Sequence, residues 1–408
     1  MNASIAERCD FLSQHTRANP WPVYRRLREL QPVVWLEELQ GWMLTRYGDC
    51  EAALHEQALS LGGGLAAMFG AMPAEVADAV LPLRRHISLG MGSLDPPEHT
   101  RIRAPMAKAF TARLIRSQRD FIQKLTDELI ESKRAQGGME VVADLAYPLP
   151  AIVIANLLGT PRSGEQLFLE CSDAIGDLFG STSPAIAVVT KAQEKVLALS
   201  EYLEELVSER AKAPVEDDLI SVLLAAGTGL TREQLVANCV ELLFAGHLTI
   251  TSMIGTCILT LLRYPHALQE LRANPALTPA AVEEIVRYDG PIQLVRRLAL
   301  QDLELGGERI AAGQMVWINL GAANRDPARH PHPNTFDLHR DNTRHLAYGM
   351  GVHYCLGAAL ARLEAQIVID TFVRQFPRLR LAGGPLRWHD LPTVRSLVSL
   401  PVVFGGSA

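Results

Sequence analysis

The segment from Thr231 to Tyr264 constrains the fold more than any other part of the chain. Thr231 followed by Gln234 makes a capping box at its start, and the proline after Tyr264 marks its end. Roughly thirty residues in helical form span ~50 Å, which is enough to cross a whole molecule. The middle of the segment, CVELLFAGHLTITSMIGTCILTLL, is apolar on nearly every face. We therefore expect a long helix buried at the centre of the protein.

The flanking sequence predicts a mainly α protein with a small β portion. Helix formers at helical spacing dominate from about residue 95 to 263, and another helix follows Cys355. Strands are expected in three places: residues 32–44, 296–319 and 397–404. Residues 61–92 mix glycines with apolar side chains without one period, so we expect a loop-rich segment that covers something apolar or is an ordinary surface segment. No linker or repeat interrupts the chain, so we expect residues 1–408 to form a single domain.

Composition excludes several broad classes of protein. The chain has 408 residues, a formal net charge of −6 and 48% hydrophobic residues, which excludes a disordered chain and disfavours a dedicated nucleic-acid binder. Its cysteines have no short paired spacing, so neither a structural zinc site nor a disulfide framework is expected. The N-terminal stretch contains charged side chains and no long apolar run, so we expect neither a signal peptide nor a membrane anchor there. A cytoplasmic protein fits these features best.

The segment with the most specific chemistry is YGMGVHYCLG, residues 348–357. Its cysteine, Cys355, comes shortly before a predicted helix, where the helix dipole and unpaired amides favour an anionic sulfur. Glycines on either side, including Gly349 and Gly357, let the backbone approach a flat ligand. A lone cysteine before a helix is usually a buried structural residue, but the full spacing Y-G-x-G-x-H-x-C-x-G outweighs that interpretation.

This segment resembles the haem-binding loop of the cytochrome P450 family, with Tyr348 where that family usually has phenylalanine. The resemblance implies that Cys355 is the axial thiolate ligand of a haem b iron. It also implies the cytochrome P450 fold, a single helix-rich domain around a buried haem. The implied activity is that of a monooxygenase, which inserts one oxygen atom from dioxygen into a lipophilic small molecule.

A second motif of the family lies in TPAAVEEIVR, where Glu284 and Arg287 are three residues apart on one helix face. Thr278 is the expected N-cap of this helix, with a proline at its first position. An isolated pair of this kind is usually an exposed ion pair of little energetic value. The resemblance implies instead the E-x-x-R brace behind the haem, which has a structural role. Its third member is usually an arginine, but Thr335 occupies that position, and Arg340 is the candidate in its place.

Four further residues match the contacts that the family makes to the two haem propionates. In DPPEHTRIR, His99 and Arg103 are four apart on a helix whose expected N-cap is the aspartate that opens the segment. Arg297 follows the E-x-x-R helix, and His353 comes two residues before the cysteine. Taken singly, each of them would more often be a surface residue. The neighbouring Arg296 is expected to face elsewhere.

The long central helix carries the stretch AGHLT, in which the resemblance implies a local opening of the helix at the oxygen-binding face. Ala245 and Gly246 would lie against the haem, and Thr249 would take the place of the proton-relay alcohol of the family. The plain alternative is a threonine hydroxyl bonded back to the preceding turn. The family usually has an acid directly before this threonine, whereas this chain has Leu248. Proton delivery would then use ordered water, a neighbouring side chain such as His247, or a polar group of the substrate.

The substrate pocket is assigned by position in the pattern of the family, and its side chains are overwhelmingly apolar. They favour a lipophilic substrate such as a terpenoid, a polyketide, a steroid or a fatty acid. The expected pocket residues are Met68, Phe69, Phe244, Ala245, Leu248, Thr249, Ile292, Leu294, Val295 and Leu397.

The resemblance implies a separate ferredoxin or flavodoxin with its reductase as the electron source, because the chain contains no fused flavin domain. This partner is expected to dock on the cysteine side, on basic residues such as Arg101, Arg113, Arg344 and Arg362. The missing acid leaves open a peroxygenase or a haem enzyme of rearrangement or coupling. The non-enzymatic alternative is a haem-based ligand-binding protein. No metal-binding role is assigned to the proline-interleaved histidines His330, His332 and His339.

Overall fold

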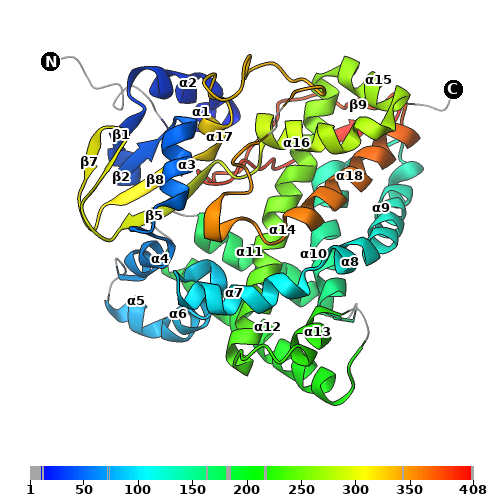
Figure 1. The fold of residues 1–408 in the computed structure, drawn as a ribbon. Coiled ribbons are helices and arrows are strands. Elements are labelled where there is room, and N and C mark those ends of the chain that lie inside the picture. The colour runs from blue at the N-terminus through cyan, green and yellow to red at the C-terminus, as the bar shows by residue number, and fades with distance from the viewer. Residues whose placement is uncertain are drawn as a thin grey trace.

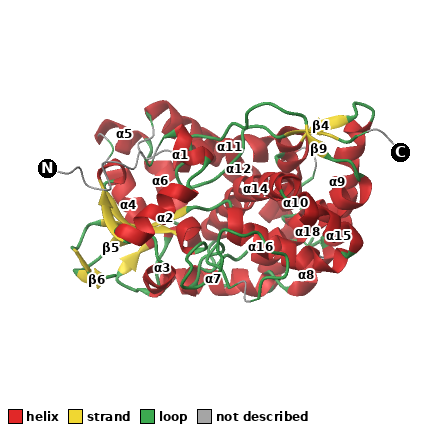
Figure 2. Cartoon of the chain, turned by 90° about the horizontal axis from the view of Figure 1, so that it is seen from above, coloured by secondary structure: helices red, strands yellow, loops and turns green. Residues whose placement is uncertain are grey.

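The computed structural model describes residues 11, 13–70, 72, 74–161, 164–180, 185–215, 218–341 and 344–405. Helices make up most of it, and the strands of the main sheet gather at one side of the molecule (Figure 1 and Figure 2). The predicted fold class, mainly α with a small β portion, is confirmed.

Helix α14 (Arg232–Arg263) runs through the middle of the helical part of the molecule (Figure 1), as its apolar sequence predicts. Thr231 and Gln234 form the expected capping box, and the helix ends before Tyr264. One 18-residue window of α14 is apolar enough to cross a membrane, but 72% of that window is buried, so the helix serves the protein core. It packs against α10 (Pro148–Leu157), α11 (Glu165–Gly180), α12 (Ile186–Lys212), α16 (Thr278–Asp289) and α18 (Ala358–Gln375).

The other helices surround this core or cover the sheet. Those of the first half are α1 (Gln14–Ala18), α2 (Trp21–Leu30), α3 (Tyr47–His55), α7 (Glu98–Ala109), α8 (Ala112–Ser117), α9 (Arg119–Arg134) and the π-helical η4 (Val142–Ala146). The later ones are α13 (Leu219–Ala225), α15 (Pro265–Ala273), η6 (Pro275–Leu277) and α17 (Leu320–Ala323).

The main sheet joins segments from both ends of the sequence, which appear as blue and yellow strands in Figure 1. Its strand order is β1-β2-β8-β5-β3. The pair β1 (Val33–Leu36) and β2 (Gly41–Leu44) is antiparallel, as the sequence predicts, with the 3-10 turn η2 (Glu37–Leu39) between the strands. Strand β8 (Met315–Asn319) runs parallel to β2, while β5 (Leu294–Ala299) is antiparallel to both β8 and β3 (Leu59–Ser60).

Two smaller sheets complete the β portion. The predicted extended tail contributes β10 (Pro401–Val403), which pairs with β4 (Gly138–Glu140) and β9 (Arg380–Leu381). The hairpin of β6 (Leu303–Leu305) and β7 (Glu308–Ile310) turns at two glycines with φ of 57° and 87°, a left-handed conformation that favours glycine.

Residues 61–92 are largely helical, so the prediction of a loop-rich segment was wrong. Helices of two turns show no clear periodicity, and contacts with the rest of the fold stabilise them. Within it, Phe69, Val80 and Leu83 are buried in the main core, which confirms that the segment covers an apolar interior. The segment forms α4 (Leu61–Gly70), α5 (Ala74–Ala79), α6 (Leu81–Ile87) and η3 (Met91–Ser93).

Two side chains that were expected to cap their own helices have partners elsewhere. The residue at the cap of α7 is Pro97, and the Asp95 carboxylate instead accepts a hydrogen bond from the Leu61 amide at 2.9 Å, at the start of α4. Thr278 is the first residue of α16, and its hydroxyl donates to Asp370 of α18 at 2.5 Å. Local sequence predicts which residues can cap a helix, but the nearest partner in space depends on the tertiary fold.

Candidate active site

Cys355 lies in the turn between η7 (Gly351–His353) and α18. Its amide donates to the Tyr348 carbonyl at 2.9 Å, which closes the loop that the motif predicts. Gly349 and Gly351 have φ of 68° and 71°, so two of the three glycines in the motif serve backbone shapes that other residues rarely adopt.

The electrostatic surroundings of the Cys355 sulfur support a thiolate only when a positive charge lies next to it. Burial raises the pKa of the thiol, while the amides of Gly357 and Ala358 and the charges of Arg103 and Arg362 act in the opposite direction. A bound metal ion deprotonates its thiol ligand, so a metal ligated by Cys355 would convert the thiol to a thiolate.

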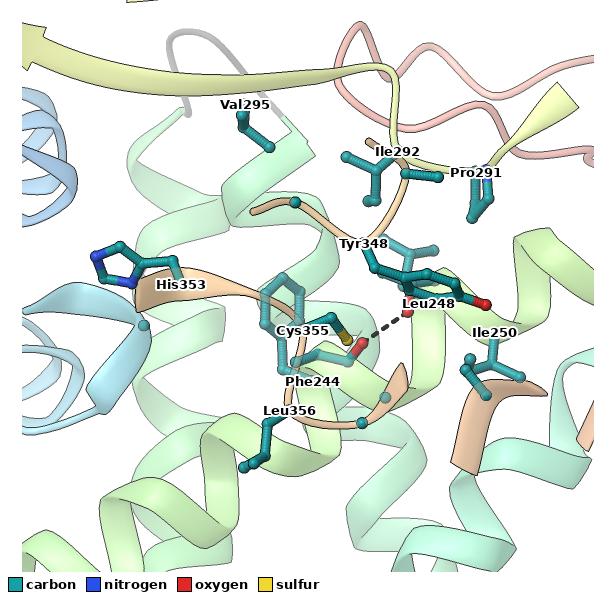
Figure 3. A pocket seen from close by; sticks show the side chains of 18 of the residues that line it. Phe244, Leu248, Ile250, Pro291, Ile292, Val295, Tyr348, His353, Cys355 and Leu356 are labelled. Carbon is teal, nitrogen blue, oxygen red and sulfur yellow. Dashed lines mark hydrogen bonds between the residues drawn. The ribbon is translucent and has the colours of Figure 1, made fainter. Parts of the chain in front are cut away.

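Next to this sulfur lies a cavity of about 440 Å³, with walls that are mostly apolar (Figure 3). Helix α14 contributes one wall with Phe244, Leu248 and Thr249, and the turn with Tyr348 and Leu356 lies across from it. The segment that leads into β5 and the strand itself add Pro291, Ile292 and Val295. The buried helix and the cysteine loop thus face each other across one space.

Four donor groups meet at one edge of this cavity, as the sequence predicts. The rings of His99 and His353 are 4.2 Å apart between centroids, and Arg103 and Arg297 line the same cavity. Burial lowers the pKa of His353 to about 4 and that of Arg297 to about 10. Both ring nitrogens of His99 are buried without a hydrogen-bond partner.

This edge fits a flat dianionic group that also carries a metal. Arg103 donates to the Tyr354 carbonyl and Arg297 to the Arg296 carbonyl, so neither guanidinium is held by a carboxylate. Unpartnered buried donors cost free energy, and two anionic oxygens would remove that cost. A sulfur donor on one wall and such donors at the edge together match haem b, with its iron and two propionates.

The E-x-x-R pair is fully buried, which fits the internal brace that the resemblance implies and excludes the alternative of an exposed ion pair. Arg287 Nε and Nη2 donate to the two carboxylate oxygens of Glu284 at 2.7 and 2.8 Å. Arg340 Nε lies 3.0 and 3.1 Å from the same two oxygens, which places it as the third member. Thr335 contributes only its carbonyl, which accepts from Arg340 at 2.7 Å.

Residues 245–249 of α14, which the resemblance places at the oxygen-binding face, remain regular helix, so the expected local opening is not present. The Thr249 hydroxyl donates to the Ala245 carbonyl at 2.7 Å, as in the alternative interpretation of a hydroxyl bonded to the preceding turn. Both line the cavity, together with Gly246 and Leu248. His247 is turned away, because its Nδ1 meets the Ser172 hydroxyl at 2.6 Å and its Nε2 the carbonyl of residue 147 at 2.8 Å.

The structure brings only part of the predicted substrate pocket together at one cavity. Phe244, Leu248, Thr249, Ile292 and Val295 line the cavity next to the cysteine, and Leu294 lines a second, adjoining cavity of about 420 Å³. The remaining three are outside the walls of both cavities, because tertiary packing places them within or against the main core: Met68, Phe69 and Leu397.

Two acids at the cavity were missed by sequence reasoning. Glu241 of α14 accepts a hydrogen bond from the Gly92 amide at 2.7 Å, and burial raises its pKa to about 7. Glu364 of α18 is 1% exposed, has one carboxylate oxygen without a partner, and has its pKa raised by burial to about 8. The sequence signal that could have revealed both residues is an acid within an otherwise apolar helix face.

The proline-interleaved histidines do not form a cluster. Nε2 of His339 lies 2.5 Å from Glu270, whereas His330 is buried against the Tyr47 ring. Within the described part of the chain, no three His, Cys, Asp or Glu side chains are grouped to hold a metal ion.

Comparison with known proteins places this geometry in a family. A family model described as Cytochrome P450 matches residues 79–381. The chain is 38% identical over 389 residues to Cytochrome P450 107B1 of Saccharopolyspora erythraea, with 93% of each chain covered. It is 34% identical to Cytochrome P450 monooxygenase PikC of Streptomyces venezuelae, with 96% of this chain and 92% of that protein covered.

Solved structures agree with the sequence comparison. The crystal structure of epothilone D-bound cytochrome P450epoK has a TM-score of 0.89 and 31% identity, and the match covers 98% of this chain and 99% of that one. The structure of P450BioI in complex with a fatty-acyl carrier protein has a TM-score of 0.88 and 32% identity, with 96% and 99% covered. The chain therefore belongs to the cytochrome P450 family and is a bacterial-type monooxygenase that binds haem b through a cysteine thiolate.

Proposed function

We propose that residues 1–408 form one cytoplasmic domain that oxygenates a lipophilic small molecule, with Cys355 as the iron ligand. The observation that carries the proposal is that the cysteine loop and the Leu248–Thr249 turn of α14 line one apolar cavity. Haem b bound there supplies dioxygen activation, to which a thiolate ligand contributes electron density.

The residues at the edge of the cavity hold the cofactor in place. His99 and Arg103 approach from α7, Arg297 from β5 and His353 from η7, so three separate elements converge on the propionate side. Because each donor comes from a rigid element, the cofactor plane is oriented by the fold rather than by one flexible loop.

Thr249 is proposed to hold water for proton delivery from its place in the cavity wall. Its hydroxyl already donates to Ala245, so its oxygen lone pairs are available to accept from water. Leu248 offers no exchangeable proton, so the proton must come through water or from a polar group of the substrate.

The apolar walls support a lipophilic substrate. Two related proteins of known structure bind such compounds: cytochrome P450epoK is in complex with epothilone D, and CYP109E1 from Bacillus megaterium with corticosterone. This chain presents Phe244, Ile292 and Val295 to the same kind of space, where burial of apolar area supplies the binding free energy.

A separate ferredoxin or flavodoxin, with its reductase, is proposed to dock beside the cysteine loop. Val352 and Tyr354 of that loop are exposed, at 52% and 41%. Arg113 is one of the four basic residues expected there. The other three pair with acids: Arg101 with Glu98 at 2.5 Å, Arg344 with Glu51 at 3.6 Å and Arg362 with Glu283 at 2.6 Å. Their charge is thus partly balanced, so apolar contact would contribute beside charge.

The proposal is tested by the absorbance of the reduced protein under carbon monoxide. We expect the red-shifted Soret band of a thiolate-ligated haem in the wild type and its loss in Cys355→Ser. Cys239→Ser on α14 is the matched control, because that buried cysteine should leave the band in place. A Cys355→Ser protein that keeps the band would contradict the assignment.

A further inference from the structure

The second cavity is a chamber with its own polar groups. It has a volume of about 420 Å³ and shares Glu241, Phe244, Val295 and Arg297 with the cavity beside the cysteine, so the two adjoin. Its other walls come from α4, α6, α11, α12 and β8. A volume of this size lies within the range of about 300–1,000 Å³ that small-molecule sites occupy.

One guanidinium in this chamber has no acidic partner. Arg296 and Arg297 are adjacent on β5, and Arg296 lines only the second cavity, while Arg297 lines both. The aliphatic part of the Arg296 side chain lies next to Gly64 of α4, and its Nη2 lies 3.5 Å from the sulfur of Met68. Among the described residues, no carboxylate lies within ion-pair distance of it.

Two almost fully buried arginines of the fold are paired with carboxylates, whereas Arg28 and Arg325 donate to backbone carbonyls instead. Arg287 is held by Glu284 at 2.7 Å and Arg395 by Asp289 at 2.5 Å, each with both side chains almost completely buried. A thioether is a weak acceptor and does not replace a carboxylate. Since burial disfavours the charge of Arg296, an anion that enters this chamber would gain a strong partner there.

The other titratable groups that face the chamber do not compete for this role. Glu241 is anchored by the Gly92 amide, and burial raises its pKa to about 7, so part of it is neutral at physiological pH. Burial lowers the pKa of His86 to about 4, which leaves its ring uncharged. Arg297 and His353 belong to the edge that faces the haem propionates.

We propose that Arg296 anchors the carboxylate of an amphiphilic substrate whose apolar chain passes Phe244 toward Thr249. A planar guanidinium binds a carboxylate through two parallel hydrogen bonds, which also orients the attached chain. This inference rests on the proposed function, because it names the class of lipophilic substrate as one with an anionic head group. It also explains why Arg296 faces the chamber instead of solvent.

The test compares three twelve-carbon probes: dodecanoate, dodecan-1-ol and dodecylammonium. Binding to the holoenzyme is measured by calorimetry below the aggregation concentration of each probe. We expect the wild type to bind dodecanoate about tenfold or more tightly than the alcohol, because a charged hydrogen-bonded pair is gained. Arg296→Gln should remove this preference, and Arg296→Lys should keep part of it. Arg309→Gln, which removes an exposed arginine from the neighbouring β7, should leave it unchanged.

Equal binding of dodecanoate and dodecan-1-ol by the wild type would overturn the proposal, as would a preference that survives in Arg296→Gln. A preference for dodecylammonium would also overturn it and would identify Glu241 as the anchor. Calorimetry does not depend on the haem spectrum. A protein without the thiolate band that still selects dodecanoate through Arg296 would refute the proposed function and support the anchor.

Discussion

Leu248 is the residue at which we expect cofactor binding and turnover to depend on different requirements. Its side chain lines the cavity directly before Thr249, where an acid would shorten the path of a proton from solvent. His247 cannot serve this purpose from its observed position, because both ring nitrogens are bonded to groups on α11 and at the start of α10. We therefore expect proton delivery at this turn to use water beside Thr249 or a polar group of the substrate.

Leu248→Glu should raise turnover driven by reductase and dioxygen by about tenfold or more, because a positioned acid–base group typically contributes at least this much. Turnover driven by hydrogen peroxide should change little, since peroxide brings its own protons. Both rates are measured on one probe substrate with the same surrogate redox proteins.

Leu248→Gln is the control, with similar size and no titratable proton, and it should stay at the wild-type rate. If neither rate changes in Leu248→Glu, proton delivery is not what limits the wild type. If the wild type already works better with peroxide than with its reductase, the peroxygenase alternative gains support.

Glu364 is expected to make the stability of the protein fall as the pH rises. Burial raises its pKa to about 8, so the native protein keeps a proton that the unfolded chain releases above its ordinary pKa. Its contribution to stability is present at low pH and is lost as the pH rises from about 5 to 8. Glu364→Gln should flatten this decline by about 2–4 kcal/mol in the free energy of unfolding measured by urea at pH 6 and 9.

Glu308→Gln on exposed β7 should leave the pH dependence as it is in the wild type. A Glu364→Gln protein with the same loss of stability between pH 6 and 9 would show that Glu364 is ionised in the native state.

The E-x-x-R brace ties elements together that are far apart in sequence. Glu284 and Arg287 project from α16, while Arg340 comes from the long irregular segment before the cysteine loop. Arg287 also donates to the carbonyls of residues 324 and 333 at 2.9 and 3.0 Å. The brace therefore fixes the irregular segment, and through it the approach to the haem ligand.

Arg287→Met should lower the free energy of unfolding by about 3–5 kcal/mol, because it leaves a buried carboxylate with one partner fewer. Arg340→Met should cost less, since Glu284 keeps the bidentate Arg287. The measurements are urea unfolding and the haem content of the purified protein.

Arg309→Met breaks an exposed ion pair with Asp302 and should cost less than about 1 kcal/mol. A similar small cost for Arg287→Met would mean that the brace does not stabilise the fold.

In the molecule as a whole, the active site lies where three parts of the fold meet. The helical part supplies α14 and α18, the sheet supplies β5, and the N-terminal half supplies α7 with its two donors (Figure 1). The space between them is mostly apolar and about 440 Å³ in volume, so haem bound there would pack against all three parts at once.

Removal of haem should therefore destabilise the protein as a whole. Binding to the native state alone adds about 4 kcal/mol when the free ligand is a thousandfold above its dissociation constant. We expect the apoprotein to unfold at a clearly lower temperature than the holoprotein, as followed by circular dichroism. Equal unfolding temperatures would show that haem contributes nothing to the stability of the fold.

Structure could be predicted from the sequence where a residue type at a given spacing serves a single structural purpose. The glycines of the cysteine loop, the capping box of α14 and the strand pair around Gly41 follow from local backbone chemistry. The four residues predicted to contact the propionates line one cavity, and each could be picked out because it lies within a recognisable motif. The pocket was harder, because Met68, Phe69 and Leu397 differ from true lining residues only in the direction in which packing turns them.

Local patterns along the chain were enough to predict a buried central helix, a cysteine before a helix N-terminus, and four cationic or histidine side chains near it. Which partners these side chains find depends on the folded arrangement. Folding buried Glu284 between two arginines, brought Asp95 to α4, and turned Arg296 into a chamber where no described carboxylate pairs with it. The physical reason is that backbone preferences act over a few residues, whereas desolvation and charge pairing depend on neighbours that only folding brings together.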